Sequence, residues 1–390
     1  LKPIIARTER VAINMADAYT RMHNGQKIGV VAVQDGPGIE ASFPAVAQAY
    51  GDNTPLLMLP GAHAPAMQDY DPQFIASKSF RDITRFASLI NDPLTIPRKL
   101  EMAFAALKNG KSGPVVVETA ANLLWGKAPA QASEDGSGYR SPGRHRSMAD
   151  PADVERILDH LLSAQRPVLI AGHGVLYAEA SGELRQLAEL LQIPVTTSLL
   201  GKSSFPEDHP LALGTAGRTI TRAAGHFANE ADFILGIGTS FTINDFTARM
   251  PADAVLGQIT STPEDIGKCR PVVCAAVGDA RLVLRQLIEL AQQKLGAQGR
   301  PESADLVAEI AQQHRAFFEE WAPRLLCDDD GPISPYRVIH EMNQLFDKSS
   351  TVVTHDAGNP RDQLVPFYQA TTPRGYLGWG KSTHLGSSLG

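Results

Sequence analysis

The sequence predicts an α/β protein made of three consecutive doubly wound domains with parallel sheets. Three observations predict this class: short apolar runs rich in β-branched residues, helical segments between them, and glycine turns directly after several runs. Strands that alternate with helices of this length are typical of parallel sheets covered by helices. The apolar runs lie at residues 27–33, 56–59, 114–118, 167–171, 193–197, 231–238 and 351–354.

The first helical segment, residues 8–21, carries Glu9 on its apolar stripe. On a 3.6-residue period Glu9 lies on the same side as Ile13, whereas Asp17 and Arg21 lie on the other side. A carboxylate directed into a core is costly unless something there needs it. A glutamate in a first turn is also favoured by the helix dipole and can lie in water. Both interpretations of Glu9 stay open at this point.

The strand predicted at residues 27–33 is followed by the turn Gly36-Pro37-Gly38. Ligands of α/β sheets bind beyond the carboxyl ends of the strands, so this turn is a candidate binding site. A helix of small residues at 41–50 and a second strand at 56–59 complete a βαβ unit.

Composition divides the rest of the chain into segments. Residues 128–150 are poor in large apolar side chains and rich in Ser, Gly, Pro, Arg and Asp, which predicts a linker after a first domain at 1–127. A central Rossmann-like domain is expected at 151–298, a helical connection at 299–332, and the start of a third domain at 333–390.

Two glycine pairs follow strands of the central domain, namely Gly172 with Gly174 and Gly236 with Gly238. Neither pair completes GxGxxG, so each is a weak dinucleotide fingerprint. A Rossmann-type nicotinamide or flavin oxidoreductase is therefore an alternative that the spacing argues against. A non-catalytic binding or assembly protein that retains the fold is a second alternative.

The overall composition excludes several classes of function. A formal net charge of -6 argues against nucleic-acid binding and against binding to anionic membranes. The 3 cysteines are too few for a disulfide framework or a zinc site and fit a reducing cytoplasm. No apolar run is long enough to span a membrane and no signal peptide is recognisable, although the chain begins at Leu1 rather than at a methionine.

The N-terminal residues resemble a known family. The glutamate, residues 15–21, Gly25, the Val-rich strand, Gly36-Pro37-Gly38 and residues 54–56 resemble the pyrimidine-binding domain of thiamine-diphosphate enzymes. The chain is most similar to the acetolactate synthase and 2-oxoacid decarboxylase branch, over nearly all of its 390 residues. The resemblance implies decarboxylation of a 2-oxo acid with carboligation. A simple 2-oxoacid or acyl-CoA decarboxylase of the same family is the alternative.

The resemblance also gives the N-terminal candidates their roles. Glu9 is expected to hydrogen-bond the pyrimidine ring nitrogen of thiamine diphosphate, and for this it should be protonated or share its proton. Gly36, Pro37 and Gly38 are expected to bind the cofactor. His63 stands where synthases have glutamine, so it is either a substrate-side proton-transfer residue or a solvated loop histidine. In the family the glutamate and the diphosphate come from different subunits, which implies a homodimer or homotetramer.

The C-terminal candidates belong to two further turns. Gly358 and Asn359 match the position where the family binds the diphosphate, with an ordinary Asx turn as the alternative. Thr383, His384 and Leu385 match the loop that grips the aminopyrimidine ring, and Leu385 stands at the bulky position that bends the cofactor. The loop departs from the family, which usually has more glycine just before this position. From residue type alone, Leu385 would be a core leucine.

The cofactors implied are thiamine diphosphate with Mg²⁺, and FAD as an open question. The chain ends at Gly390, before the family's magnesium motif, so no metal ligand is expected in it and the third domain is expected to be incomplete. The first domain is expected to lack an N-terminal strand and helix. The FAD-binding members tend to have aspartate where this chain has Thr260 and Thr262, although Asp279 remains. Bound FAD and a purely structural central domain are the two alternatives.

Overall fold

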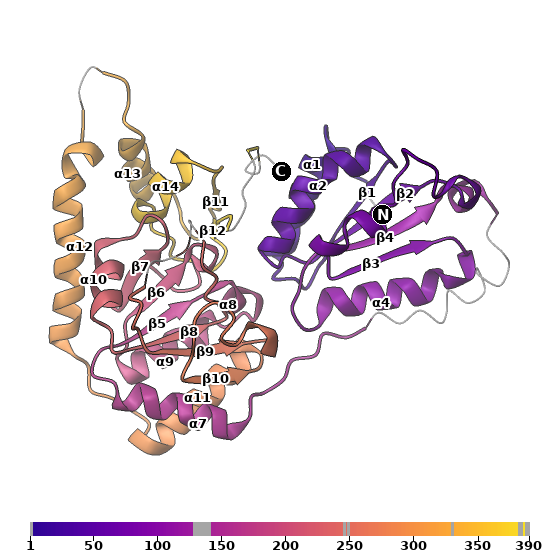
Figure 1. Ribbon diagram of the computed structural model, residues 1–390. Coiled ribbons are helices and arrows are strands. Elements are labelled where there is room, and N and C mark those ends of the chain that lie inside the picture. The colour runs from indigo at the N-terminus through magenta and orange to yellow at the C-terminus, as the bar shows by residue number, and fades with distance from the viewer. Residues whose placement is uncertain are drawn as a thin grey trace. The chain divides into compact units, whose positions relative to one another are not determined.

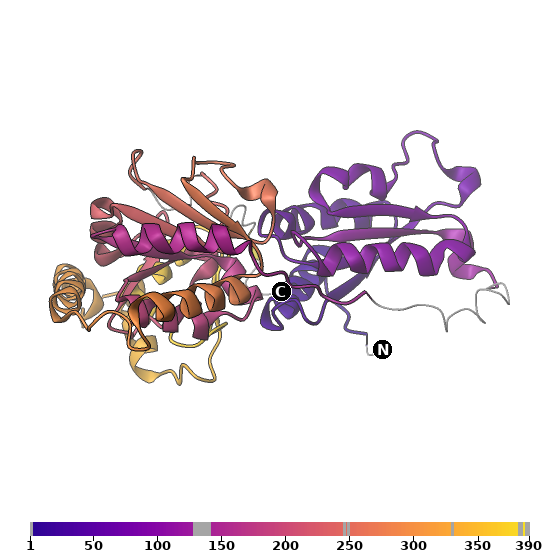
Figure 2. The same cartoon turned by 90° about the horizontal axis from the view of Figure 1, so that it is seen from below.

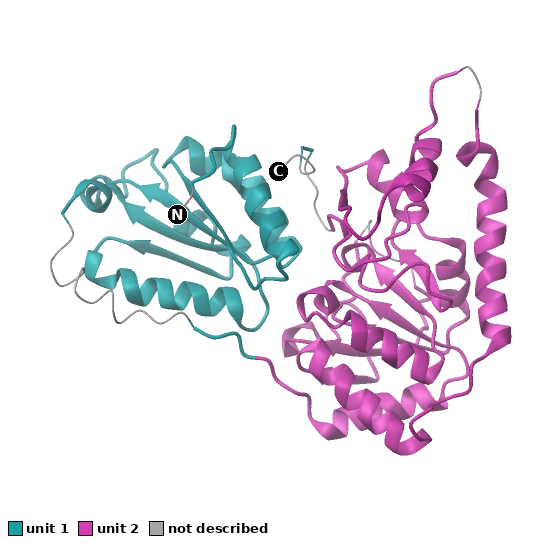
Figure 3. Cartoon of the chain, turned by 180° about the vertical axis from the view of Figure 1, so that it is seen from behind, with its two compact units in different colours: residues 1–145, 381–390 teal, residues 146–380 magenta. Residues whose placement is uncertain are grey.

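A computed structural model describes residues 3–127, 142–244, 247, 250–328, 331–380, 385 and 386. The chain forms two compact units, shown in teal and magenta in Figure 3: unit 1 contains residues 1–145 and 381–390, and unit 2 contains residues 146–380. Each unit contains parallel sheets and helices, so the predicted α/β class is confirmed. No helix in the described part of the chain combines the length and the apolar character needed to cross a membrane.

Unit 1 contains a four-stranded parallel sheet with the order β1-β2-β4-β3 (Figure 1). Its strands are β1 (Gly29–Val33), β2 (Leu56–Ala62), β3 (Phe86–Ile90) and β4 (Val115–Ala120). Its helices are α1 (Glu9–Met22), α2 (Pro37–Gly51), α3 (Ala76–Ser79), α4 (Ile96–Lys108) and α5 (Ala121–Trp125). Apolar side chains of α1 and α2 pack with alternate residues of the strands, such as Met58, whereas Leu107 of α4 packs with the intervening ones, such as Leu57. Helices therefore cover both faces of the sheet.

The first helix is buried along one broad face. Thr8 caps its N-terminus, because the Thr8 hydroxyl accepts a hydrogen bond from the backbone N–H of Val11. Arg21 pairs with Asp17 on the same helix, and its Nη2 lies 3.0 Å from Oδ2 of Asp52. Burial raises the pKa of the Asp17 carboxyl, against the charge of Arg21. Asp17 and Arg21 therefore form an internal ion-pair cluster on the same buried face as Ile13, so the prediction that they lie on the other side of the helix is wrong.

Unit 2 contains a six-stranded parallel sheet with the order β10-β9-β8-β5-β6-β7. Its strands are β5 (Pro167–Ala171), β6 (Val195–Ser198), β7 (Ala212–Ala216), β8 (Phe233–Ile237), β9 (Leu256–Thr260) and β10 (Cys274–Val277). Its first helices are α7 (Pro151–Ser163), α8 (His173–Tyr177), α9 (Ser181–Leu191), α10 (Arg222–Glu230), α11 (Ala280–Leu295) and α12 (Ala304–Leu325). Figures 1 and 2 show α7 and α11 side by side, and α10 packs against α12.

The glycine pairs of unit 2 allow two strand-end turns to touch. A Cβ on Gly174 would lie 2.7 Å from the Cα of Gly238, and a Cβ on Gly172 would collide with the carbonyl oxygen of Gly238. The turns after β5 and β8 therefore pack backbone against backbone, which only glycine permits.

A smaller layer follows in unit 2, with α13 (Pro335–Leu345), β11 (Val353–Thr354), α14 (Asn359–Phe367) and β12 (Tyr376–Leu377). The strands β11 and β12 form a two-stranded parallel sheet. Its apolar cluster includes Leu199, which follows β6, so this layer is packed onto the six-stranded part of unit 2.

Candidate functional site

The sequence-predicted glutamate and turn meet in unit 1. Glu9 is the first residue of α1 and is partly buried, so it lies neither in the core nor wholly in water. A Cβ on Gly38 would lie 3.5 Å from Oε1 of Glu9. The absence of a side chain at residue 38 thus leaves the carboxylate directly over the backbone of the turn. Among the described residues, none forms a hydrogen bond or ion pair with the Glu9 carboxylate.

The local sequence explains this approach. Gly36 has φ of +59°, a left-handed conformation that favours glycine, and it lets the chain reverse after β1. Pro37 then occupies the first turn of α2, where its fixed φ is suited to a helix start. The helices α1 and α2 lie side by side in Figure 1, which brings the first turn of each to the same place.

An acid and a histidine meet at the carboxyl edge of the same sheet. Asp35 follows β1 and His63 follows β2, and Oδ2 of Asp35 lies 3.6 Å from Nδ1 of His63. The side chains are 35% and 33% exposed, respectively, so solvent reaches both. A Cβ on Gly61 would lie 3.4 Å from the backbone nitrogen of Asp35. The end of β2 therefore lies directly against the turn that holds Asp35.

Glu118 of β4 lies near this pair and is buried. Its two carboxylate oxygens accept hydrogen bonds of 2.9 Å from the backbone N–H groups of Ala76 and Ser77, at the start of α3. Burial raises the pKa of the Glu118 carboxyl, and these hydrogen bonds and the charge of His63 oppose the rise. Asp35, His63 and Glu118 thus come from β1, β2 and β4, which are neighbours in the sheet.

The sequence-based prediction found His63 but missed Asp35 and Glu118. The available signal was their place at the ends of predicted strands. The backbone of His63 is fixed by Gln68, whose amide donates to the His63 carbonyl at 2.9 Å. Gln68 also exchanges two side-chain hydrogen bonds with Asn91, which follows β3. The loop after β2 is therefore tied to the end of β3.

Gly358 and Asn359 lie at the N-terminus of α14 in unit 2, and both are exposed. Gly358 has φ of +81°, and no atom lies within 4 Å of the place of a Cβ there. No side chain caps the helix. Free backbone N–H groups and the helix dipole make such an end suitable for an anion.

The turn before α14 begins with a buried histidine. Nδ1 of His355 lies 2.9 Å from the carbonyl oxygen of Asp356, so this nitrogen donates. The other ring nitrogen, Nε2, is buried and has no partner. Burial lowers the pKa of His355 to about 4, which keeps the ring neutral near pH 7. His355 therefore fixes the start of the turn that leads to Gly358.

The last three candidates are only partly within the described residues. Thr383 and His384 lie outside them. Leu385 is 68% exposed and belongs to unit 1, so it is not the core leucine that its residue type alone would predict.

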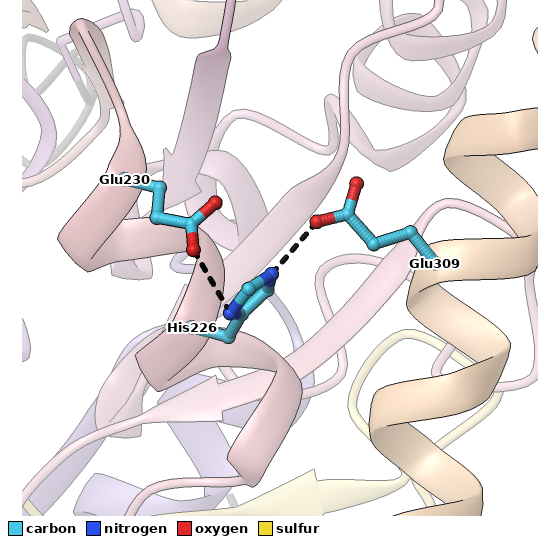
Figure 4. Close-up of side chains that lie close together, drawn as sticks. All are labelled: His226, Glu230 and Glu309. Atoms are coloured by element: carbon cyan, nitrogen blue, oxygen red, sulfur yellow. Dashed lines mark hydrogen bonds and ion pairs between the residues drawn. The ribbon is translucent and has the colours of Figure 1, made fainter.

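A further cluster in unit 2 has the residue types of a metal site. The ligand atoms of His226, Glu230 and Glu309 lie within 4.8 Å of one another, and Figure 4 shows the imidazole between the two carboxylates. Arg166, however, lies 2.9 Å from Oε2 of Glu230 and 2.7 Å from Oε1 of Glu309. The hydrogen bond from Arg166 lowers the pKa of Glu309. Because a guanidinium already balances the carboxylates, we assign this cluster to fastening α12 onto α10.

Two family models match the sequence. Residues 1–81 match the N-terminal TPP binding domain of thiamine pyrophosphate enzymes, and residues 154–287 match the central domain of the same enzymes.

Curated relatives match nearly the whole chain. The probable acetolactate synthase large subunit of Methanocaldococcus jannaschii is 29% identical over 97% of this chain and 64% of its own length. The glyoxylate carboligase of Escherichia coli O157:H7 is 30% identical over 91% of this chain and 59% of its own length. The acetolactate synthase isozyme 3 large subunit of Escherichia coli K12 is 30% identical over 99% and 67%. The chain therefore spans about two thirds of the length of these relatives.

Proposed function

Because this chain belongs to the family of thiamine pyrophosphate enzymes, in its acetolactate synthase branch, we propose that it is part of an enzyme that decarboxylates a 2-oxo acid and joins the remaining unit to a second carbonyl compound. The position of the Glu9 carboxylate beside the turn, with Oε1 3.5 Å from where a Cβ on Gly38 would lie, carries this proposal. Relatives named acetolactate synthase and glyoxylate carboligase support the carboligation. A decarboxylase without carboligation is the nearest alternative.

The residues of unit 1 fit the aminopyrimidine end of thiamine diphosphate. Gly38 places no side chain beside Oε1 of Glu9, which would leave room for a ring nitrogen, and the carboxylate has no described partner that it would have to give up. Glu9 then holds the shared proton at that ring nitrogen. Gly36 and Pro37 fix the backbone of the turn that leads to Gly38.

Taken by themselves, the residues of unit 2 fit the diphosphate of a thiamine diphosphate molecule. The uncapped N-terminus of α14 can donate backbone hydrogen bonds to a diphosphate, and Asn359 can add its side-chain amide. Mg²⁺ is expected with the diphosphate. When bound, thiamine diphosphate supplies the nucleophilic carbon that adds to the 2-oxo acid. Thr383, His384 and Leu385 remain proposed contacts of the aminopyrimidine ring.

For the central domain we favour a structural role over bound FAD. A dinucleotide would have to approach the two glycine turns closely. The backbone at Gly174 and the backbone at Gly238 already pack against each other there. The same packing argues against a Rossmann-type oxidoreductase. The five segments predicted from the sequence remain our proposal for the domain boundaries.

The proposed enzyme is a cytoplasmic homodimer or homotetramer with a small-molecule substrate. The thiols of Cys269 and Cys274 are compatible with a reducing compartment. The family's sharing of a site between subunits supports the oligomer.

The test is Glu9→Gln in the natural full-length protein, with thiamine diphosphate, Mg²⁺ and a panel of 2-oxo acids that includes pyruvate and benzoylformate. We expect turnover to fall about 10²–10⁴-fold, the range for loss of a proton-transfer group. Calorimetry measures cofactor binding in parallel.

Glu40→Gln is the matched control, because Glu40 is also a first-turn glutamate, at the exposed start of α2. We expect this variant to keep full activity. Wild-type turnover by Glu9→Gln would contradict the proposal. An absence of both turnover and cofactor binding in the wild-type protein would favour the non-catalytic assembly protein.

A further inference from the structure

The approach of Asp35 to His63 favours one of the two nitrogens of a neutral imidazole as the site of its proton. A carboxylate can only accept hydrogen bonds when it is ionised, and Oδ2 of Asp35 faces Nδ1 of His63 at 3.6 Å. A small shift of either side chain would bring these two atoms within hydrogen-bond distance, and on a neutral ring that hydrogen bond requires the proton on Nδ1. Nε2, on the opposite side of the ring, is left to accept a proton, or to donate one when the ring is charged.

Both partners are held by the backbone at strand ends. The turn that contains Asp35 lies against Gly61, where a Cβ would lie 3.4 Å from the Asp35 nitrogen. On the other side, the amide of Gln68 holds the His63 carbonyl. The carboxylate and the ring thus meet because β1 and β2 are paired in register, with Val33 beside Pro60.

The second acid near His63 is already engaged. Both oxygens of Glu118 accept backbone N–H groups at the start of α3. By contrast, His63 is the only described residue that pairs with the Asp35 carboxylate. Glu118 therefore contributes charge to the surroundings of the ring, and Asp35 is the acid that is free to orient it.

We propose that Asp35 is a positioning residue for His63, which it holds as the Nδ1–H tautomer so that Nε2 meets the 2-oxo acid at the carboxyl edge of β2. The catalytic part of this inference rests on the proposed function. The orientation of the ring rests on the geometry alone. A carboxylate that orients an imidazole in this way acts through the histidine and does not touch the substrate.

The experiment is Asp35→Asn in the natural full-length protein labelled with ¹⁵N-histidine, with the ring signals of His63 assigned by their loss in His63→Asn. In the wild type we expect the nitrogen shifts of the Nδ1–H tautomer. An asparagine amide can present a donor to Nδ1, so the variant is expected to shift the ring toward the Nε2–H form. We expect kcat to fall about 10–100-fold, the range for loss of an orienting partner, with little change in KM.

Asp69→Asn is the matched control, because Asp69 is an exposed acid of the same unit that pairs with Lys78. It should change neither the ring signals nor kcat. Asp35→Glu restores a carboxylate and should recover the tautomer in part, which also guards against a folding defect in Asp35→Asn.

The two proposals fail in different ways. Unchanged ring signals in Asp35→Asn overturn the positioning role, even where Glu9→Gln abolishes turnover. A shifted tautomer upholds that role even where no 2-oxo acid is turned over. A shifted tautomer with wild-type kcat overturns the catalytic part of the inference.

Discussion

Two pairs of an acidic and a basic side chain follow parallel strands of this chain, and they differ most in burial. In unit 1 Asp35 and His63 are 35% and 33% exposed and lie 3.6 Å apart. In unit 2 Lys202 and Glu207 are 1% and 7% exposed, and Nζ of Lys202 lies 2.6 Å from both carboxylate oxygens. A pair that water reaches can exchange a proton with a small molecule. The pair that is closed off from solvent contributes to the packing of the fold.

The buried pair connects two parts of unit 2. Glu207 also accepts a hydrogen bond of 2.8 Å from the backbone N–H of Ala370, and its own N–H donates to the Ala370 carbonyl. Lys202 lies over the ring of Tyr376, with Nζ 5.4 Å from the ring centroid. Desolvation lowers the pKa of Lys202, and the charge of Glu207 opposes this. The segment around β12 is thus anchored to the loop after β6.

The difference between the two pairs is tested most directly by replacing Lys202. Replacement of Lys202 by Met leaves the Glu207 carboxylate buried without its cation, so we expect the free energy of unfolding to fall by about 3–5 kcal/mol. His63→Asn, in the exposed pair, should change it by less than about 0.5 kcal/mol. Urea unfolding followed by fluorescence and circular dichroism measures both.

A double variant sharpens this result. Lys202→Met combined with Glu207→Gln removes both charges, and part of the lost stability should return because no buried charge is left unpaired. Equal costs for Lys202→Met and His63→Asn would falsify the distinction between a structural and an accessible pair.

The sequence predicted the parts of the fold that depend on local pattern. The strand predicted at 167–171 matches β5, which is buried along its whole length, and the helix predicted at 8–21 lies within one residue of α1 at each end. The edge strand β3 was not predicted, since its side chains are mostly half-buried and its apolar signal is short. The strand β7 was missed because its run of Ala, Leu, Gly and Thr lacks β-branched periodicity.

The sequence predicted the candidate site only where its residues lie close together along the chain. The turn after β1 and the helix start before it lie close in the sequence, so Glu9 and Gly38 could be paired. The grouping of Asp35 and His63 with Glu118 depends on β2 lying between β1 and β4. Strand order is set by how all the helices pack, which no local pattern encodes. Likewise, the burial of Asp17 and Arg21 required a distant partner, Asp52.

A buried histidine of unit 2, His355, is expected to make the stability of the fold depend on pH. The ordinary pKa of 6.5 falls to about 4 in folded His355. Above the ordinary value the ring is neutral in both states and the stability is fully present. As the pH falls below 6.5, His355 binds a proton in the unfolded chain but stays neutral in the folded chain. The free energy of unfolding therefore falls by about 3 kcal/mol as the pH approaches 4.

His355→Asn removes this titration while keeping a donor for the Asp356 carbonyl. We expect its unfolding free energy to change less between pH 7.5 and pH 4.5 than that of the wild type, by about 3 kcal/mol. If His355→Asn loses as much unfolding free energy between pH 7.5 and pH 4.5 as the wild type, groups other than His355 cause the loss.

The cluster around Arg166 is intermediate in burial between the exposed pair of unit 1 and the buried pair of unit 2. Its loss is expected to change the stability least among the variants predicted to destabilise unit 2. Arg166 and Glu309 are 40% and 29% exposed, so solvent screens much of their attraction. Glu309→Gln should lower the free energy of unfolding by about 1 kcal/mol, because it weakens the contact between α12 and α10. Zn²⁺ should leave the melting temperature unchanged, since the guanidinium already balances the carboxylates. A saturable Zn²⁺ stabilisation that His226→Asn abolishes would instead make this cluster a metal site, accessible to solvent in a way that the buried pair of Lys202 and Glu207 is not.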